Sequence, residues 1–228
     1  MSGPNGQPNL PAVLDAVRIL SPLRTWPIHG EEHWRRVATN GLELAGAVGA
    51  DPLLAVLFGI FHDSMRFDEY RDEDHGKRGG FLACCINSEL MGLSEDRLDL
   101  LYLACAGHSN GETSDDPTIG VCWDADRLDL CRLGEQIRPE SMSTAPGRTI
   151  PALRRAMALL TATPEWASIF RRLDGVTSGF PAAGSTPRPP ALVENRHASP
   201  EPAGRRYWTA TLLNTPSRAP GDAEERPS

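Results

Sequence analysis

The chain has 228 residues, with 30 acidic and 23 basic side chains and a formal net charge of −7. This acidic balance argues against a partner that is a long nucleic acid, and no apolar run approaches the roughly 20 residues of a membrane span. Nine of the 20 prolines lie after Phe180, so we expect a flexible N-terminus over residues 1–10, one domain over 11–179 and a disordered Pro-rich tail over 180–228.

Apolar residues recur at helical spacing throughout the expected domain, and no alternating strand pattern of any length is present. Glu31 and Glu32 suit the first turn of the second helix, because acidic side chains are favoured at a helix N-terminus. Asp51 and Pro52 then open a helix that is apolar nearly all round, so we expect it at the centre of the core. We predict an all-α domain with helices over residues 11–20, 30–48, 52–63, 75–90, 94–107, 119–133, 151–160 and 164–173.

The five cysteines are an odd number, two of them are adjacent, and none forms a CxxC pair. This usage is not typical of a disulfide framework or of a zinc knuckle. The N-terminal sequence also lacks the pattern of a signal peptide. We therefore expect a cytoplasmic protein in which the cysteines are small buried hydrophobic residues.

The most informative residues are histidines and aspartates set in apolar helices. His62 and Asp63 are adjacent in the most apolar helix, where both groups are costly to bury unless partners satisfy them. A divalent cation satisfies both at once, since it binds imidazole nitrogen and carboxylate oxygen. Further ligands would come from other helices, with His33 as one candidate and either Asp124 or Asp126 as another.

Three short motifs surround these residues: HWRRV at 33–37, FHDS at 61–64 and ADRL at 125–128. In this order and on helices, they resemble the HD-domain metal-dependent phosphohydrolase superfamily over residues 29–133. The resemblance implies an HD-domain helical bundle and favours Asp126 over Asp124. It implies a metal site formed by His33, His62, Asp63 and Asp126.

The chemistry implied by the resemblance is hydrolysis of a small phosphorylated substrate, such as a phosphomonoester, a diester or a nucleotide. The cofactor would be a divalent ion (Mn, Mg, Co, Ni, Zn or Fe) that lowers the pKa of a water and neutralises phosphate charge. Asp63 is then the candidate catalytic residue that orients or deprotonates the water. His75 and His108 are candidates for a second metal or for substrate contact, and Arg36, Lys77 and Arg78 for substrate binding.

The sequence departs from better-known branches of that superfamily just after the HD pair. Branches that hydrolyse guanosine tetraphosphate resemble one another in a Glu-Asp pair there, and some nucleotidases carry a Glu one turn after the Asp. Met65 and Arg66 stand here instead. The substrate therefore stays open.

Three alternatives remain beside the phosphohydrolase. One is a di-iron oxygenase of HD-type fold, which uses a similar His-rich ligand set. Another is a non-catalytic module that binds a ligand without turnover. The third is an esterase with Ser109 as nucleophile, because residues 107–111 match G-x-S-x-G; this motif needs a strand before the serine and a helix after it.

Overall fold

The computed structural model describes residues 8–177, and all regular structure in that range is helical. This confirms the all-α prediction, while the expected tail over 180–228 lies outside the described residues, as do residues 1–7. In chain order the α-helices are α1 (Leu10–Leu20), α2 (Glu31–Val48), α3 (Pro52–Phe61), α4 (His75–Ile86), α5 (Glu95–Gly107), α6 (Pro117–Asp129), α7 (Ile150–Leu159) and α8 (Trp166–Thr177). Short turns of other helix types follow α4 (Asn87–Met91) and α6 (Leu130–Leu133), and a third spans Pro139–Ser141.

Several helices begin where a capping side chain is followed by proline. Asn9, Asp51, Asp116 and Thr149 each accept a hydrogen bond from a backbone N–H in the first turn of the helix that follows. Proline in that turn costs little, because its missing N–H would have no partner inside the helix. These signals explain why helix starts were predicted closely from the sequence.

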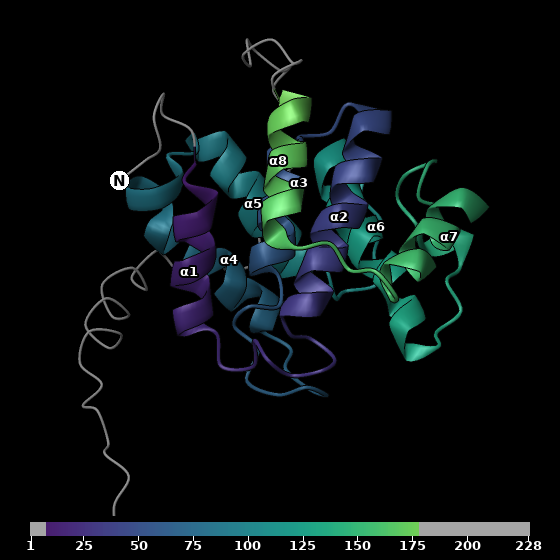
Figure 1. Cartoon of the computed structure of the whole chain (residues 1–228), viewed down its shortest axis with the longest axis horizontal. Coiled ribbons are helices and arrows are strands. Elements are labelled where there is room, and N and C mark those ends of the chain that lie inside the picture. The colour runs from purple at the N-terminus through teal and green to yellow at the C-terminus, as the bar shows by residue number, and fades with distance from the viewer. Residues whose placement is uncertain (1–7, 178–228) are drawn as a thin grey trace, which may run out of the picture. The chain divides into compact units, whose positions relative to one another are not determined.

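The core is built around α3, in which every residue from Leu53 to Phe61 is buried. An all-apolar helix of this kind can only be stable with neighbours on every side. Figure 1 shows α3 behind α8 and between α2 and α5, and its buried side chains share one hydrophobic cluster with α1, α2, α4, α5, α6 and α8. The central position predicted for this helix is confirmed.

Helix α3 ends at Phe61, so the His-Asp pair lies just beyond it and not within it as we expected. A tight turn follows, in which Ser64 N–H and Ser64 Oγ both donate to the Phe61 carbonyl. Successive side chains on a helix point about 100° apart. His62 keeps helical dihedrals (φ −54°, ψ −43°) as the C-cap of α3, and its Nε2 still lies 3.6 Å from Asp63 Oδ2, so both side chains reach the same space.

Helix α4 packs closely against two neighbouring segments, at one glycine each. A Cβ on Gly79 would lie 2.1 Å from Phe61 O, and one on Gly76 would lie 2.1 Å from Cys105 O in α5. Neither position has room for a side chain. The glycines of this segment therefore let α4 pack against the end of α3 and against α5, which brings His75 next to the HD pair.

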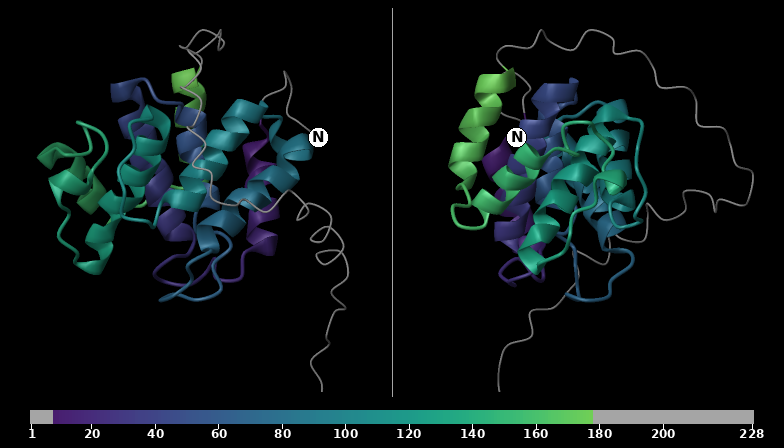
Figure 2. Two further views of the ribbon diagram at one scale, coloured as in Figure 1. Left: turned by 180° about the vertical axis from the view of Figure 1, so that it is seen from behind. Right: turned by 90° about the vertical axis from the view of Figure 1, so that its right-hand side faces the viewer.

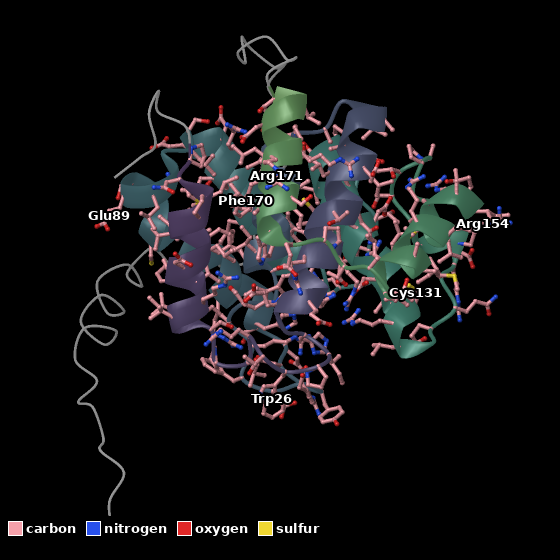
Figure 3. The ribbon with its side chains drawn as sticks, in the orientation of Figure 1. Trp26, Glu89, Cys131, Arg154, Phe170 and Arg171 are labelled. Atoms are coloured by element: carbon pink, nitrogen blue, oxygen red, sulfur yellow. The ribbon has the colours of Figure 1, made fainter. Side chains whose placement is uncertain are left out.

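The loops over residues 21–30 and 62–74 lie together at one end of the helices (Figures 1 and 2). Glu69 joins them, since it accepts a hydrogen bond from Ile28 N–H (3.3 Å) and contacts His29 Nδ1 at 2.5 Å. Trp26 projects from this end into solvent (Figure 3). Both loops lead directly into residues of the candidate site.

Two smaller expectations can also be compared with the structure. Cys105 and Cys122 are buried as expected, but Cys84 and Cys85 are exposed, because they lie on the outer face of α4. Among residues 8–177, no helix combines the length and the apolar character needed to cross a bilayer.

Candidate metal centre

The side chains of His33, His62, Asp63 and Asp126 converge from α2, the turn after α3, and α6. His33 Nε2 lies 3.4 Å from Asp63 Oδ2 and 3.3 Å from Asp126 Oδ1. His62 Nε2 lies 3.6 Å and 3.7 Å from the same two oxygen atoms. The four residues predicted from the motifs therefore form one cluster. Asp126 is its most exposed member, with 16% of its side chain accessible.

A second group of ligand atoms lies on the other oxygen of Asp63. His75 Nε2 is 3.1 Å from Asp63 Oδ1, and His108 Nε2 is 3.5 Å from it. The ligand atoms of His33, His62 and Asp63 lie within 4.8 Å of one another, and so do those of Asp63, His75 and His108. The structure thus brings both histidines into the site, and Asp63 joins two triads through its two oxygen atoms.

All four imidazoles present Nε2 to the cluster and use Nδ1 to bond an acceptor behind them. The acceptors are Asp129 Oδ2 for His33 (2.7 Å), Phe58 O for His62 (3.0 Å), Asp72 O for His75 and Cys105 O for His108 (2.7 Å). A carbonyl or carboxylate oxygen carries no hydrogen, so Nδ1 must donate. Each neutral ring therefore turns an Nε2 lone pair toward the cluster, as metal-binding histidines do.

The four Nε2 atoms face one another two by two. Nε2 of His33 lies 3.0 Å from Nε2 of His62, and Nε2 of His75 lies 3.0 Å from Nε2 of His108. Two unprotonated nitrogen atoms would repel at this separation, so each pair requires a cation, either a proton or a metal ion. Imidazole and carboxylate donors are the set that divalent transition metals prefer. The residues present therefore fit a divalent ion in each triad.

The surroundings set different charges on the first two histidines. Burial lowers the pKa of His62 to about 3, so this ring is neutral at pH 7. Burial acts in the same direction on His33, but hydrogen bonds to three carboxylates outweigh it and raise the pKa of His33 to about 10. Burial raises the pKa of Asp63, yet the histidines around it hold that pKa well below its usual range. Without a metal, one proton is shared near the two rings.

Asp129 is a functional residue that the sequence analysis missed. It is fully buried, accepts the His33 Nδ1 hydrogen and accepts a second bond from Arg36 Nε at 2.7 Å. Carboxylates behind a metal-binding histidine fix its tautomer and orientation. The missed signal was spacing, because Asp129 follows Asp126 by three residues and so shares its helix face.

Arg36 was expected to bind substrate, and the structure places it behind the cluster. Its guanidinium pairs with Asp129, and it lines an open cavity of about 330 Å³ together with Arg132 and Glu32. Its contact with the site therefore passes through Asp129 and His33.

The other two cations expected at the substrate do not join the cluster. Lys77 Nζ is exposed and pairs with Asp74 at 2.8 Å. Arg78 donates to Met65 O at 3.1 Å and pairs with Asp72. Both therefore bind the loop that precedes α4, and a substrate role for them stays a prediction.

A different arginine, Arg66, contacts the cluster directly. Its Nε donates to Asp63 Oδ1 at 3.0 Å, and its NH2 group lies 3.2 Å from His75 Nε2. The sequence analysis noted Arg66 only as a departure from better-known branches.

Asp124 is not part of the cluster. Its carboxylate accepts hydrogen bonds from Ser143 N–H (2.6 Å), Thr144 N–H (2.8 Å) and Thr144 Oγ1 (2.7 Å). It fixes the loop before α7, so the choice between the two aspartates falls on Asp126 as the one near the histidines.

The esterase alternative lacks its structural context. Ser109 follows helix α5, whereas a nucleophile elbow needs a strand before the serine. No strand occurs in residues 8–177. The G-x-S-x-G match is therefore a coincidence of sequence.

Comparison with known proteins finds no matching family model and no matching curated protein. A structural match is a protein from an uncultured Thermotogales bacterium, described as a predicted HD superfamily hydrolase. It is 23% identical in sequence with a TM-score of 0.53, and the match covers 74% of this chain and 94% of that one. Together with the all-helical architecture, this match shows that the chain has the fold of an HD-superfamily protein.

Proposed function

We propose that the protein is a metal-dependent hydrolase of a small phosphorylated substrate. The observation that carries this proposal is the pair of Nε2 atoms of His33 and His62, which face each other at 3.0 Å beside two carboxylates. Three buried titratable groups and a half-buried carboxylate placed this close together are costly to maintain unless they bind a cation. The fold of HD-superfamily hydrolases supports the same conclusion.

Phosphoester hydrolysis needs a bound metal ion, an activated water and access for the substrate, and different residues of the cluster suit each of these roles. A divalent ion held by His33, His62, Asp63 and Asp126 would polarise a phosphoryl oxygen and lower the pKa of a water. Asp63 Oδ1 and Oδ2 face both triads, so this side chain is placed to orient the attacking water and to accept its proton. Asp126 lies where the cluster opens to solvent, which gives the substrate a side of approach.

The test is phosphate release from a panel of phosphorylated metabolites, with each of Mn, Mg, Co, Ni, Zn and Fe added to metal-free protein. We expect hydrolysis of at least one substrate with at least one metal, and loss of at least a hundredfold in Asp63→Asn. The exposed aspartate variant Asp96→Asn is the control and should retain full activity.

The same panel separates the alternatives. Metal binding without release of phosphate from any substrate would favour a ligand-binding module. Iron content with consumption of dioxygen would favour the oxygenase. Equal hydrolysis by the wild-type protein and by Asp63→Asn would contradict the proposal, because the activity would then arise elsewhere or from a contaminant.

A further inference from the structure

The guanidinium of Arg66 lies where a second cation would bind. It makes three contacts: Nε with Asp63 Oδ1 (3.0 Å), NH2 with His75 Nε2 (3.2 Å) and NH1 with Asp68 O (3.1 Å). Two of these acceptors belong to the second triad of ligand atoms. A positive side chain therefore already contacts two of the three ligand atoms that a second metal ion needs.

The hydrogen positions support this assignment. His75 Nδ1 donates to the Asp72 carbonyl, so in the neutral ring Nε2 is an acceptor and can take a hydrogen from Arg66. Asp63 Oδ1 accepts from Arg66 through Nε. Arginine has donors only and stays charged at every physiological pH. Arg66 thus supplies hydrogen bonds and positive charge to two members of the second triad, Asp63 and His75, when no second ion is present. The third member, His108, keeps its own contact with His75 Nε2 at 3.0 Å.

Arg66 lies on a more exposed segment of the chain than His108, a ligand of the second triad. It belongs to the loop between α3 and α4, where Phe67 is 60% and Tyr70 is 88% exposed. His108, in contrast, lies at the end of α5 and is tied to its own helix through Nδ1. Displacing Arg66 breaks its three side-chain hydrogen bonds and moves the side chain toward solvent, to which 10% of it is already accessible.

We propose that Arg66 is an internal cation that competes with a metal ion for the second triad, so that the two triads fill in sequence. The first ion binds His33, His62, Asp63 and Asp126 without disturbing Arg66. A second ion binds Asp63, His75 and His108 only when it displaces the guanidinium. This inference rests on the proposed function for the identity of the first site, and it adds that the chain itself weakens the second.

The experiment is a calorimetric titration of metal-free protein with Zn²⁺ at constant pH, supported by mass spectrometry of the intact protein. Arg66→Leu removes the competing charge without adding a ligand atom. Breaking two charge-assisted hydrogen bonds corresponds to about a 100- to 10,000-fold change in affinity. We expect Arg66→Leu to bind the second ion by that factor more tightly than the wild-type protein does, with the first ion unchanged.

Two controls make the comparison specific. Arg71→Leu removes an arginine from the same loop that is exposed and pairs only with Glu73 among the described contacts, so both affinities should equal those of the wild-type protein. Adding His108→Ala to Arg66→Leu removes a ligand of the second triad and should abolish the gain. If Arg66→Leu binds the first ion but gains no affinity for the second, the proposal is wrong.

A measurement on the wild-type protein covers the case in which Arg66→Leu does not fold. The Nε–H signal of Arg66 in a ¹⁵N NMR spectrum should keep its hydrogen-bonded shift through one equivalent of Zn²⁺. It should move to the value of a free guanidinium as the second equivalent binds. A signal that stays unchanged through two bound equivalents overturns the proposal. Failure to bind even one equivalent contradicts the proposed function and not the role of Arg66 alone.

Discussion

Binding of the first metal ion should release one proton, and its affinity should depend steeply on pH. The perturbation is pH itself. His33 must lose its Nε2 hydrogen to become a ligand, and its pKa is raised to about 10 by the surrounding carboxylates. His62, with a pKa of about 3, is already neutral, and the pKa of Asp63 is held well below its usual range. Only His33 therefore carries a proton that the ion must displace.

The sign and size of the effect follow from this pKa. Below pH 10 the protonated form of His33 dominates, so each unit of lower pH should weaken metal binding about tenfold. At pH 7 the competition amounts to about a thousandfold, or about 4 kcal/mol of binding free energy. Above pH 10 the dependence on His33 should vanish. Acidification therefore weakens binding, and alkaline pH strengthens it until the ring is deprotonated.

The assay is calorimetry with up to one equivalent of Zn²⁺, repeated at one pH in buffers that differ in ionisation enthalpy. The slope of the observed binding enthalpy plotted against the buffer's ionisation enthalpy gives the number of protons released per ion bound. We expect about one proton at pH 7 to 8. Release of no proton, with affinity independent of pH from 6 to 8, would falsify the assignment of His33 as a ligand that is protonated in the metal-free protein.

Three further variants test particular contacts. Asp129→Asn removes the carboxylate behind His33, and we expect about a 10- to 100-fold loss of metal affinity in a calorimetric titration; unchanged affinity would remove Asp129 from the site. Gly79→Ala places a methyl group 2.1 Å from Phe61 O, so thermal unfolding should show a loss of about 1–3 kcal/mol, and an unchanged melting temperature would refute the close packing. Asp124→Asn should cost about 1–3 kcal/mol of stability while leaving metal stoichiometry intact, and loss of bound metal there would contradict its purely structural role.

Local sequence signals predicted most of the fold. The pair Asp51–Pro52 marked the start of the central helix, and the structure has the cap bonds that this pair implies. Gly134, with φ 75°, ends the turn after α6 where a stop was expected. These features depend on residues a few positions apart, and periodicity and capping chemistry act over that range. The end of α3 was misjudged, because the turn that follows depends on packing with α4.

The site was predictable only in part. His62 and Asp63 could be picked out because titratable residues in an apolar helix need partners. His33 and the two aspartates, Asp124 and Asp126, were then candidates, and the motif resemblance favoured Asp126. Spacing alone did not separate Asp124 from Asp126, since the difference depends on a loop about 20 residues further along the chain. The spacing of three residues from Asp126 puts Asp129 on the same helix face, but its contact with His33 joins residues 96 positions apart and could not be predicted from that spacing.

Arg66 and the glycines of α4 show a second reason why parts of the structure could not be predicted from the sequence. Arg66 stood in the sequence as an unexplained departure from a pattern, and its meaning depends on the place of His75 across the loop. The glycines of α4 had no role assigned from the sequence, and at Gly76 and Gly79 the structure uses them for close helix packing. A residue that is small for steric reasons looks the same in sequence as one that approaches a ligand.

The central claim is that the buried cluster around Asp63 is a divalent metal site. The most direct test is the metal content per chain of protein purified without chelators, measured by elemental analysis for the wild-type protein and for Asp63→Ala. We predict at least one tightly bound ion per wild-type chain and none in Asp63→Ala, with both proteins folded by circular dichroism. A wild-type protein that neither contains nor takes up a divalent ion, or a variant with undiminished metal content, would contradict it.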